Sequence, residues 1–184
     1  YASVRGRIPI VDENGKLRPF VLEARKRGVV FDAGHGGGSF LWSQAVPATK
    51  QGFYPDVIST DLHTGSMNGG MKDILNTMSK FLNLGMPLSE VIARSTVEPA
   101  KLIERPELGT LSVGAEADIA VFDLEEGQFS FVDCGKARLV GDRRFACVLT
   151  LRAGEAVFNP HGIGLPEWRD APEAYWKSVV RISG

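Results

Sequence analysis

The alternation of apolar and polar positions divides the chain into an N-terminal region with mixed α/β patterning and a later β-rich region. In the first region, an amphipathic stretch at 20–27 predicts a short helix that ends at Gly28. The apolar run 29–32 then predicts a buried strand, residues 40–51 a helix, and residues 56–61 a second strand. A strand, a helix and a strand in this order are typical of the βαβ unit of a parallel sheet.

Two further helices are expected before the pattern changes. Apolar residues recur at helical spacing over 74–82, and the stretch is stopped by Gly85 and Pro87. Residues 89–103 predict another helix, which Pro99 should perturb because proline has no amide hydrogen to donate.

From residue 108 onward, short apolar runs alternate with Gly and Asp turns, which predicts a small β-domain. The expected strands cover residues 117–123, 129–131 and 147–151. We therefore divide the chain into an α/β part at 1–106, a β part at 107–158 and a tail at 159–184. The tail is rich in Pro, Trp and charge, and we expect it to wrap the surface.

Composition narrows the class of protein. The chain has 184 residues, 43% hydrophobic and 23% charged, which is typical of a soluble globular protein. Its 21 basic and 22 acidic residues give a net charge of -1, which argues against a nucleic-acid partner. There is no apolar run of about 18 residues, so no membrane helix is expected. Cys134 and Cys147 form no CxxC pair, so we expect free thiols and a cytoplasmic location.

Candidate chemistry lies where the two expected strands end, which is where parallel α/β folds place their active sites. The first strand runs into a glycine-rich loop that contains Gly34, His35 and Gly36. The second ends at Asp61, with His63 two residues further on. A carboxylate there can ligate a divalent metal or act as a general base, and histidine can ligate or donate to substrate. The glycines let the backbone approach a ligand closely.

Each of these features also has an ordinary structural interpretation. An aspartate at a strand end often forms a turn or caps a helix, and a histidine before glycines is often a simple loop residue. A phosphate loop is poorly supported, because the loop has no GKS/T ending and a GxGxxG match fails at Ser39. No GxSxG or HExxH motif is present. Spacing alone thus favours two βα units of a parallel barrel or sheet with a hydrolytic or metal site.

The motif strings carry a resemblance to a known family. FDAGHGGGSF at 31–40 and PDVISTDLH at 55–63 resemble the amidohydrolase superfamily, closest to its deacetylase and dihydroorotase-like branch. Shorter matches follow in the same order: MSKF at 78–81, LGM at 84–86, ST at 95–96, PA at 99–100, LGTL at 108–111, GA at 114–115 and ADIA at 117–120. The resemblance covers about residues 1–158. It implies the last two strands and helices of a (β/α)8 barrel, followed by part of a small β-sandwich.

The resemblance also implies roles for the candidate residues. Residues 57–61 would form the eighth barrel strand and 29–32 the seventh. Asp61 matches the aspartate that touches metal and takes a proton from the attacking water. The loop residues around the site would bind substrate: Gly34, His35, Gly36 and His63. The implied cofactor is zinc or another divalent metal, as one or two ions, and the implied reaction is amide or ester hydrolysis of a small molecule.

The family's metal site requires a His-x-His pair, a mid-barrel lysine or glutamate and two later histidines, which this chain of three histidines does not have. Residues 1–7 resemble the stretch after the sixth-strand histidine. We therefore expect the C-terminal part of a longer enzyme, with about 200 residues upstream that carry most metal ligands. The isolated chain is expected to be inactive and to bind zinc weakly. It should also be marginally stable, and either form a homo-oligomer or associate with the missing N-terminal part.

Three alternatives stay open at this point. The principal hypothesis is a deacetylase or acyl hydrolase with Asp61 as general acid and base. A cyclic amidohydrolase that opens a ring, as dihydroorotase does, is the alternative reaction. A non-catalytic half-barrel that needs a partner chain is the alternative from another class of protein.

Overall fold

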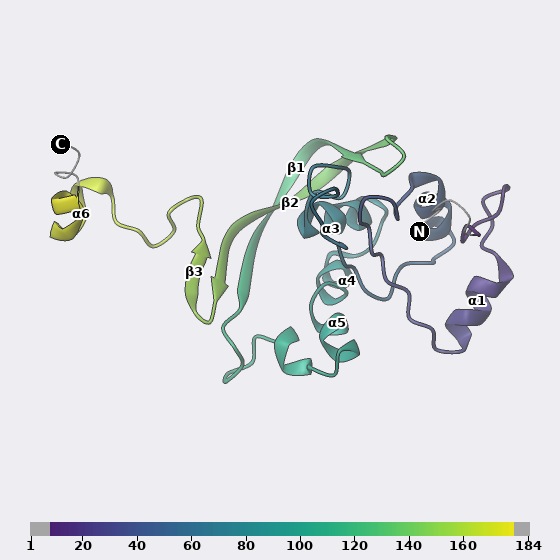
Figure 1. Cartoon of the computed structure of the whole chain (residues 1–184), viewed down its shortest axis with the longest axis horizontal. Coiled ribbons are helices and arrows are strands. Elements are labelled where there is room, and N and C mark those ends of the chain that lie inside the picture. Colours follow the sequence, from purple (N-terminus) through teal and green to yellow (C-terminus); the bar gives the residue numbers. More distant parts are fainter. Residues whose placement is uncertain (1–7, 179–184) are drawn as a thin grey trace.

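The computed structural model describes residues 8–178, so the stretch 1–7, which carries part of the sequence resemblance, lies outside the described residues. The helices are α1 (Pro19–Lys26), α2 (Trp42–Lys50), α3 (Ile74–Asn83), α4 (Leu88–Ala93), α5 (Val97–Leu102) and α6 (Glu173–Ser178), with short 3₁₀ turns η1 (Pro106–Gly109) and η2 (Trp168–Asp170). The strands are β1 (Ile119–Val132), β2 (Arg138–Arg152) and β3 (Glu155–Phe158). Figure 1 shows the first four helices gathered at one end of a long β-ribbon, with α6 at the opposite end of the molecule.

The two segments expected to be parallel strands do run side by side. Asp32 and Val57 form a parallel bridge, in which the Ala33 amide donates to the Val57 carbonyl at 3.0 Å. The bridge is isolated, however, and Val29 and Val30 are each 46% exposed. The expectation of two strands at 29–32 and 56–61 is therefore wrong, since neither segment is a regular strand and Val29 and Val30 are not buried. The reason is that the described hydrogen bonds join 31–33 to 56–57 along one side only.

The amphipathic helices follow the sequence closely. The helices expected at 20–27, 40–51 and 74–82 are confirmed as α1, α2 and α3. The helix expected at 89–103 is interrupted, and α4 and α5 replace it. Thr96 takes a non-helical backbone conformation between them, with φ -133° and ψ -83°. Pro99 then falls in the first turn of α5, where a missing amide hydrogen is tolerated.

The β region is simpler than its sequence suggests. β1 and β2 form one antiparallel hairpin of 14 and 15 residues, and β3 adds four residues in the order β1-β2-β3. The strands expected separately at 117–123 and 129–131 are one strand, because β1 continues through a register shift between Glu126 and Phe129. The described residues form one three-stranded sheet, so the second sheet of the expected sandwich is not among them.

The main core forms where α3 lies against the hairpin. Phe40, Phe81, Phe131 and Phe145 are buried together there. Ser79 fixes the contact, because its hydroxyl accepts the Phe145 amide at 3.0 Å and donates to the Leu75 carbonyl at 2.6 Å. A smaller cluster, with Val11, Val21, Ala48 and Phe53, packs α1 against α2.

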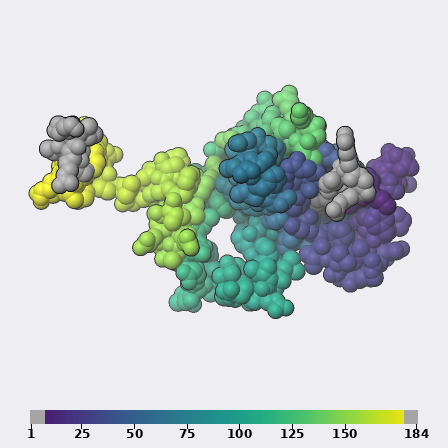
Figure 2. All heavy atoms as spheres, in the orientation of Figure 1, coloured from purple at the N-terminus to yellow at the C-terminus, as the bar shows by residue number. Residues whose placement is uncertain are grey.

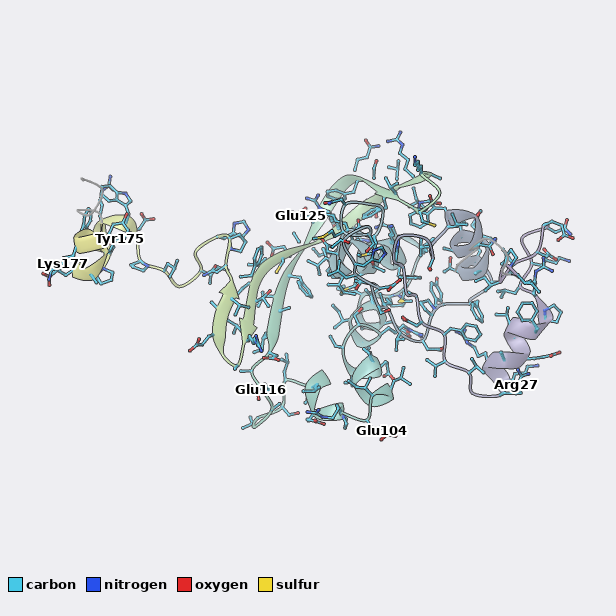
Figure 3. The ribbon with its side chains drawn as sticks, viewed as in Figure 1. Arg27, Glu104, Glu116, Glu125, Tyr175 and Lys177 are labelled. Atoms are coloured by element: carbon cyan, nitrogen blue, oxygen red, sulfur yellow. The ribbon has the colours of Figure 1, made fainter. Side chains whose placement is uncertain are left out.

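The tail does not wrap the surface in the described residues, so that expectation is wrong. It forms a narrow extension beyond the main body (Figure 2), and Tyr175 and Lys177 lie on α6 at its far end (Figure 3). Its apolar rings contact one another instead, with the Trp168 and Trp176 centroids 5.9 Å apart. Among residues 8–178, no helix has the length and apolar character needed to cross a membrane.

Candidate functional site

The loops that follow the two parallel segments meet, as the sequence predicts. The Gly36 amide donates to the Thr60 carbonyl at 2.7 Å, which joins the glycine-rich loop to the end of the second segment. Gly36 has a φ of +46°, and a Cβ atom there would overlap the Asp61 carboxylate. Glycine is thus required at 36 both by conformation and by space, and it allows the loop to lie directly against Asp61.

His63 takes part in the same contact. A Cβ atom on Gly37 would stand 3.3 Å from His63 Nε2, so the ring lies against the glycine-rich loop. The Gly65 amide donates to His63 Nδ1 at 3.1 Å, and the His63 amide donates to the Ser66 hydroxyl oxygen at 3.0 Å. These bonds orient the ring so that Nε2 faces the loop. Asp61 and His63 are both exposed, so a carboxylate and an imidazole are presented beside one glycine-rich backbone.

Asp32 and Gly34 stand at the entrance to this loop. The Ser59 hydroxyl donates to Asp32 Oδ2 at 2.6 Å, which ties the two parallel segments together beyond their bridge. Gly34 has a φ of +38°, and a Cβ atom there would contact the Asp32 carboxylate at 3.4 Å. Asp32 therefore has a structural partner within the chain. The substrate-binding roles of Gly34, His35, Gly36 and His63 stay predictions.

His35 has a different environment from the one the sequence suggests. Its ring is fully buried and stacks on Phe40 with centroids 4.7 Å apart. Nδ1 lies 2.9 Å from the Gly36 carbonyl, and Nε2 lies 2.6 Å from Lys80 Nζ. A carbonyl only accepts, so Nδ1 carries the hydrogen and Nε2 accepts from Lys80. Burial, and then the Lys80 charge, lowers the pKa of His35 to about 4. The ring is neutral at pH 7 and supports the loop from beneath.

Lys80 is the residue that sequence reasoning missed. Its side chain is fully buried, and Nζ donates at 2.6 Å to His35 Nε2, to the Gly70 carbonyl and to the Val132 carbonyl. Burial lowers the pKa of Lys80 to about 7, against the opposing attraction of the Asp133 carboxylate. The one signal in the sequence was the MSKF string at 78–81, which includes this lysine and matches the family. Its burial is known only from the structure.

The described residues do not complete the metal site that the family resemblance implies. Within 8–178 no group of three or more His, Cys, Asp or Glu side chains is placed to hold a metal ion. Asp61 and His63 are two donors, and His35 Nε2 is bound to Lys80, whereas a catalytic zinc takes three protein ligands. A metal held at Asp61 would need ligands from outside this part of the chain.

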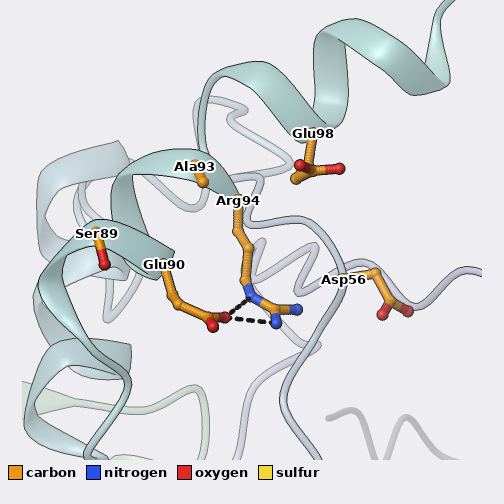
Figure 4. A pocket seen from close by; sticks show the side chains of 6 residues that line it. All are labelled: Asp56, Ser89, Glu90, Ala93, Arg94 and Glu98. Carbon is orange, nitrogen blue, oxygen red and sulfur yellow. Dashed lines mark hydrogen bonds and ion pairs between the residues drawn. The ribbon is translucent and has the colours of Figure 1, made fainter.

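Two hollows lie near these elements, and they differ in character. The one in Figure 4, of about 540 Å³, lies between Asp56 and helices α4 and α5. Its charged groups are already paired: Arg94 with Glu90 at 2.7 Å, and Asp56 with Arg25 at 3.3 Å. A second hollow, of about 370 Å³, adjoins the candidate site. It is lined by Gly37, Gly65, Asn68, Gly69, Gly70, Val132, Asp133, Cys134 and Lys136.

Comparison with known sequences identifies the family to which the chain belongs. Residues 43–157 match the sequence model of the Amidohydrolase family. The match covers more than half of the chain, and the chain belongs to this family.

Individual relatives and solved structures resemble the chain over part of their length. A deacetylase of Brucella anthropi is 42% identical over 106 residues, which cover 58% of this chain and 26% of that protein. A deacetylase of Enterococcus faecalis is 30% identical over 145 residues, which cover 78% of this chain and 39% of that protein. Among solved structures, an adenine deaminase matches with TM-score 0.77 and 30% identity over 82% of this chain and 41% of its own. A dihydroorotase matches with TM-score 0.74 and 34% identity, over 86% of this chain and 41% of its own. The chain thus spans well under half the length of these proteins.

Proposed function

We propose that the natural protein carrying this chain hydrolyses an amide or ester bond of a small acylated molecule, with Asp61 as general acid and base. The observation that carries the proposal is the exposed Asp61 carboxylate, set against the glycine at 36 and beside His63, where two parallel segments end. Membership of the amidohydrolase family and the deacetylase relatives support it.

The chain's own residues suggest a simple division of labour. The Asp61 carboxylate takes a proton from water as the water oxygen attacks the acyl carbon. The tetrahedral species then collapses, the carbon–nitrogen or carbon–oxygen bond breaks, and Asp61 returns the proton to the leaving atom. His63 Nε2 stands beside the glycine-rich loop, where it can hold the substrate by a hydrogen bond. The products are a carboxylic acid and an amine or alcohol, so atoms and protons balance.

The wider architecture is part of the same proposal. The bridged segments at 29–32 and 56–61 would be the last two strands of a (β/α)8 barrel, a placement supported by their parallel pairing and by the structural matches. Zinc or another divalent metal would be the cofactor of the whole protein, as one or two ions. Asp61 is the side chain that this chain would contribute to it.

A ring-opening reaction is the second candidate. It is favoured by the dihydroorotase match, which at 34% identity covers 86% of this chain. Ring opening and amide deacylation both hydrolyse a carbon–nitrogen bond, so the same Asp61 chemistry would serve either one.

The test begins with the intact mass of the natively produced protein, because a mass near 20.0 kDa would favour a non-catalytic module that needs a partner. The purified natural protein is then assayed on N-acetylated amino acids, acetate esters and dihydroorotate. Asp61→Asn should lower kcat by about 10²–10⁴-fold, the usual contribution of general acid–base catalysis. Asp142→Asn, at a carboxylate 85% exposed on β2, should leave it unchanged.

The panel separates the alternatives. Turnover of acyl substrates supports the deacylase, and turnover of dihydroorotate alone supports ring opening. An Asp61→Asn protein with wild-type kcat would rule out the assigned role of Asp61 in either reaction.

A further inference from the structure

We propose that Lys80 is a positioning residue, which holds both loops of the candidate site against the end of the β-sheet. This inference rests on the proposed function, because it assigns a role in that same site. Lys80 touches neither Asp61 nor His63 in any described hydrogen bond, so its action is through the loops.

The geometry joins three segments at one nitrogen. An ammonium group has three N–H donors, and each of them has an acceptor at 2.6 Å. His35 belongs to the glycine-rich loop, Gly70 lies in the loop between Asp61 and α3, and Val132 ends β1. The acceptors are 45, 10 and 52 residues away from Lys80 in the chain. One side chain from α3 thus donates hydrogen bonds to three segments that are far apart in sequence.

Both sides of the catalytic carboxylate depend on this nitrogen. His35 precedes Gly36, which lies directly against Asp61, so fixing the His35 ring fixes that backbone. On the other side, a Cβ atom on Gly70 would overlap the Val132 carbonyl, so the loop presses against the strand end at the point where Lys80 binds both. Loss of Lys80 would free both loops at once.

The ammonium group of a lysine is usually exposed to solvent or paired with a carboxylate. Lys80 is instead fully buried, and among the described residues it forms no ion pair within 4.0 Å. Asp133 is the carboxylate whose charge attracts Lys80, but it accepts hydrogen bonds from the Trp42 and Ala137 amides at 3.0 and 2.8 Å. The ammonium lies over the rings of Phe40 at 5.1 Å and Trp42 at 5.6 Å, which partly replace its hydration.

Burial of such a group is unfavourable compared with an apolar side chain of the same length. Its three directed bonds to the site loops are the feature that an apolar residue could not reproduce. The titratable groups that face Lys80 are His35, Asp133 and Cys134.

The test compares Lys80→Met with Ser79→Ala in the natural protein. Ser79 is the neighbouring buried residue on α3, and it binds β2 through Phe145 without contacting either loop. Both variants lose buried hydrogen bonds, so a purely structural role would give them similar effects. Two readouts are used: amide hydrogen exchange at Gly36 and Ser66, whose amides bond within the site loops, and the separate values of kcat and KM.

Lys80→Met is expected to speed exchange at Gly36 and Ser66 selectively, and to lower kcat about 10–100-fold with little change in KM, because small misplacements of catalytic groups are costly. Equal exchange profiles for Lys80→Met and Ser79→Ala would overturn the proposal. If Lys80→Met does not fold, Lys80→Gln, which keeps two N–H donors, is compared with Ser79→Ala in the same way. If the wild-type protein hydrolyses nothing, the proposed function fails, and the exchange data alone decide the role of Lys80.

Discussion

Lys80→Met should also change how the free energy of unfolding depends on pH. In the folded chain burial lowers the pKa of Lys80 to about 7, whereas an unfolded lysine keeps the ordinary value of 10.5. Between these values the unfolded state binds more protons than the folded state, so wild-type stability rises with pH across this window. The stability that depends on this pKa difference is fully present above pH 10.5 and is lost as the pH falls to about 7.

The magnitude follows from the two pKa values. Each pKa unit corresponds to 1.36 kcal/mol, so the full window is worth about 5 kcal/mol. The methionine side chain of the Lys80→Met variant has no proton to lose, and groups other than Lys80 titrate in both proteins. The difference between the two stability curves therefore isolates this lysine.

The assay is urea unfolding of the natural protein at several pH values between 6.5 and 9.5. Relative to Lys80→Met, wild-type stability should rise by about 1.4 kcal/mol per pH unit near pH 8.5. Lys101→Met, at a lysine 56% exposed on α5, should run parallel to wild type. Parallel curves for Lys80→Met and wild type would mean that Lys80 keeps its ordinary pKa in the folded chain, and would refute the lowered pKa.

Three other outcomes are expected. Because the pKa of His35 is lowered to about 4 from 6.5, wild-type stability should fall by about 3 kcal/mol as the pH drops from 6.5 to 4, and His35→Gln should flatten this slope in acid urea titrations. Gly36→Ala should reduce kcat by displacing Asp61, while Gly38→Ala, where a Cβ atom meets nothing within 4 Å, should not; equal kcat values would contradict the packing of the loops. Phe81→Ala should cost about 3–5 kcal/mol in urea unfolding, and a loss under about 1 kcal/mol would contradict its place in the core.

The sequence predicts α1 and α3 well because each of them carries a clear amphipathic pattern. It fails where local signals conflict with packing. Gly127 looks like a turn, but β1 continues through it by a shift in register, so two expected strands are one. Thr96 carries no breaker signal of its own, yet the helix expected at 89–103 ends before it and restarts after it. Neither outcome can be derived from periodicity, which records the average face of a segment and not a single irregular residue.

The candidate site divides in the same way. Asp61, His63 and Gly36 come together because the carboxyl ends of neighbouring parallel segments share one edge, which is a rule of topology. Lys80 could not be found by that rule. A lysine within a helix is expected on the solvent face, yet residues 77–82 are all buried. Two of its three partners are main-chain carbonyls, which have no signature in a sequence.

The change in composition near residue 106 does not separate two hydrophobic cores. Phe131 and Phe145, from the hairpin, are buried in the same core as Phe40 and Phe81. The Trp42 indole donates to the Phe131 carbonyl at 3.0 Å, so α2 is also bound to β1. Because Val132 at the end of β1 shares Lys80 with the site loops, the sheet helps to fix the loop beside Asp61. The β region is thus part of the support for the candidate catalytic carboxylate, and changes at the end of β1 should reach it through that lysine.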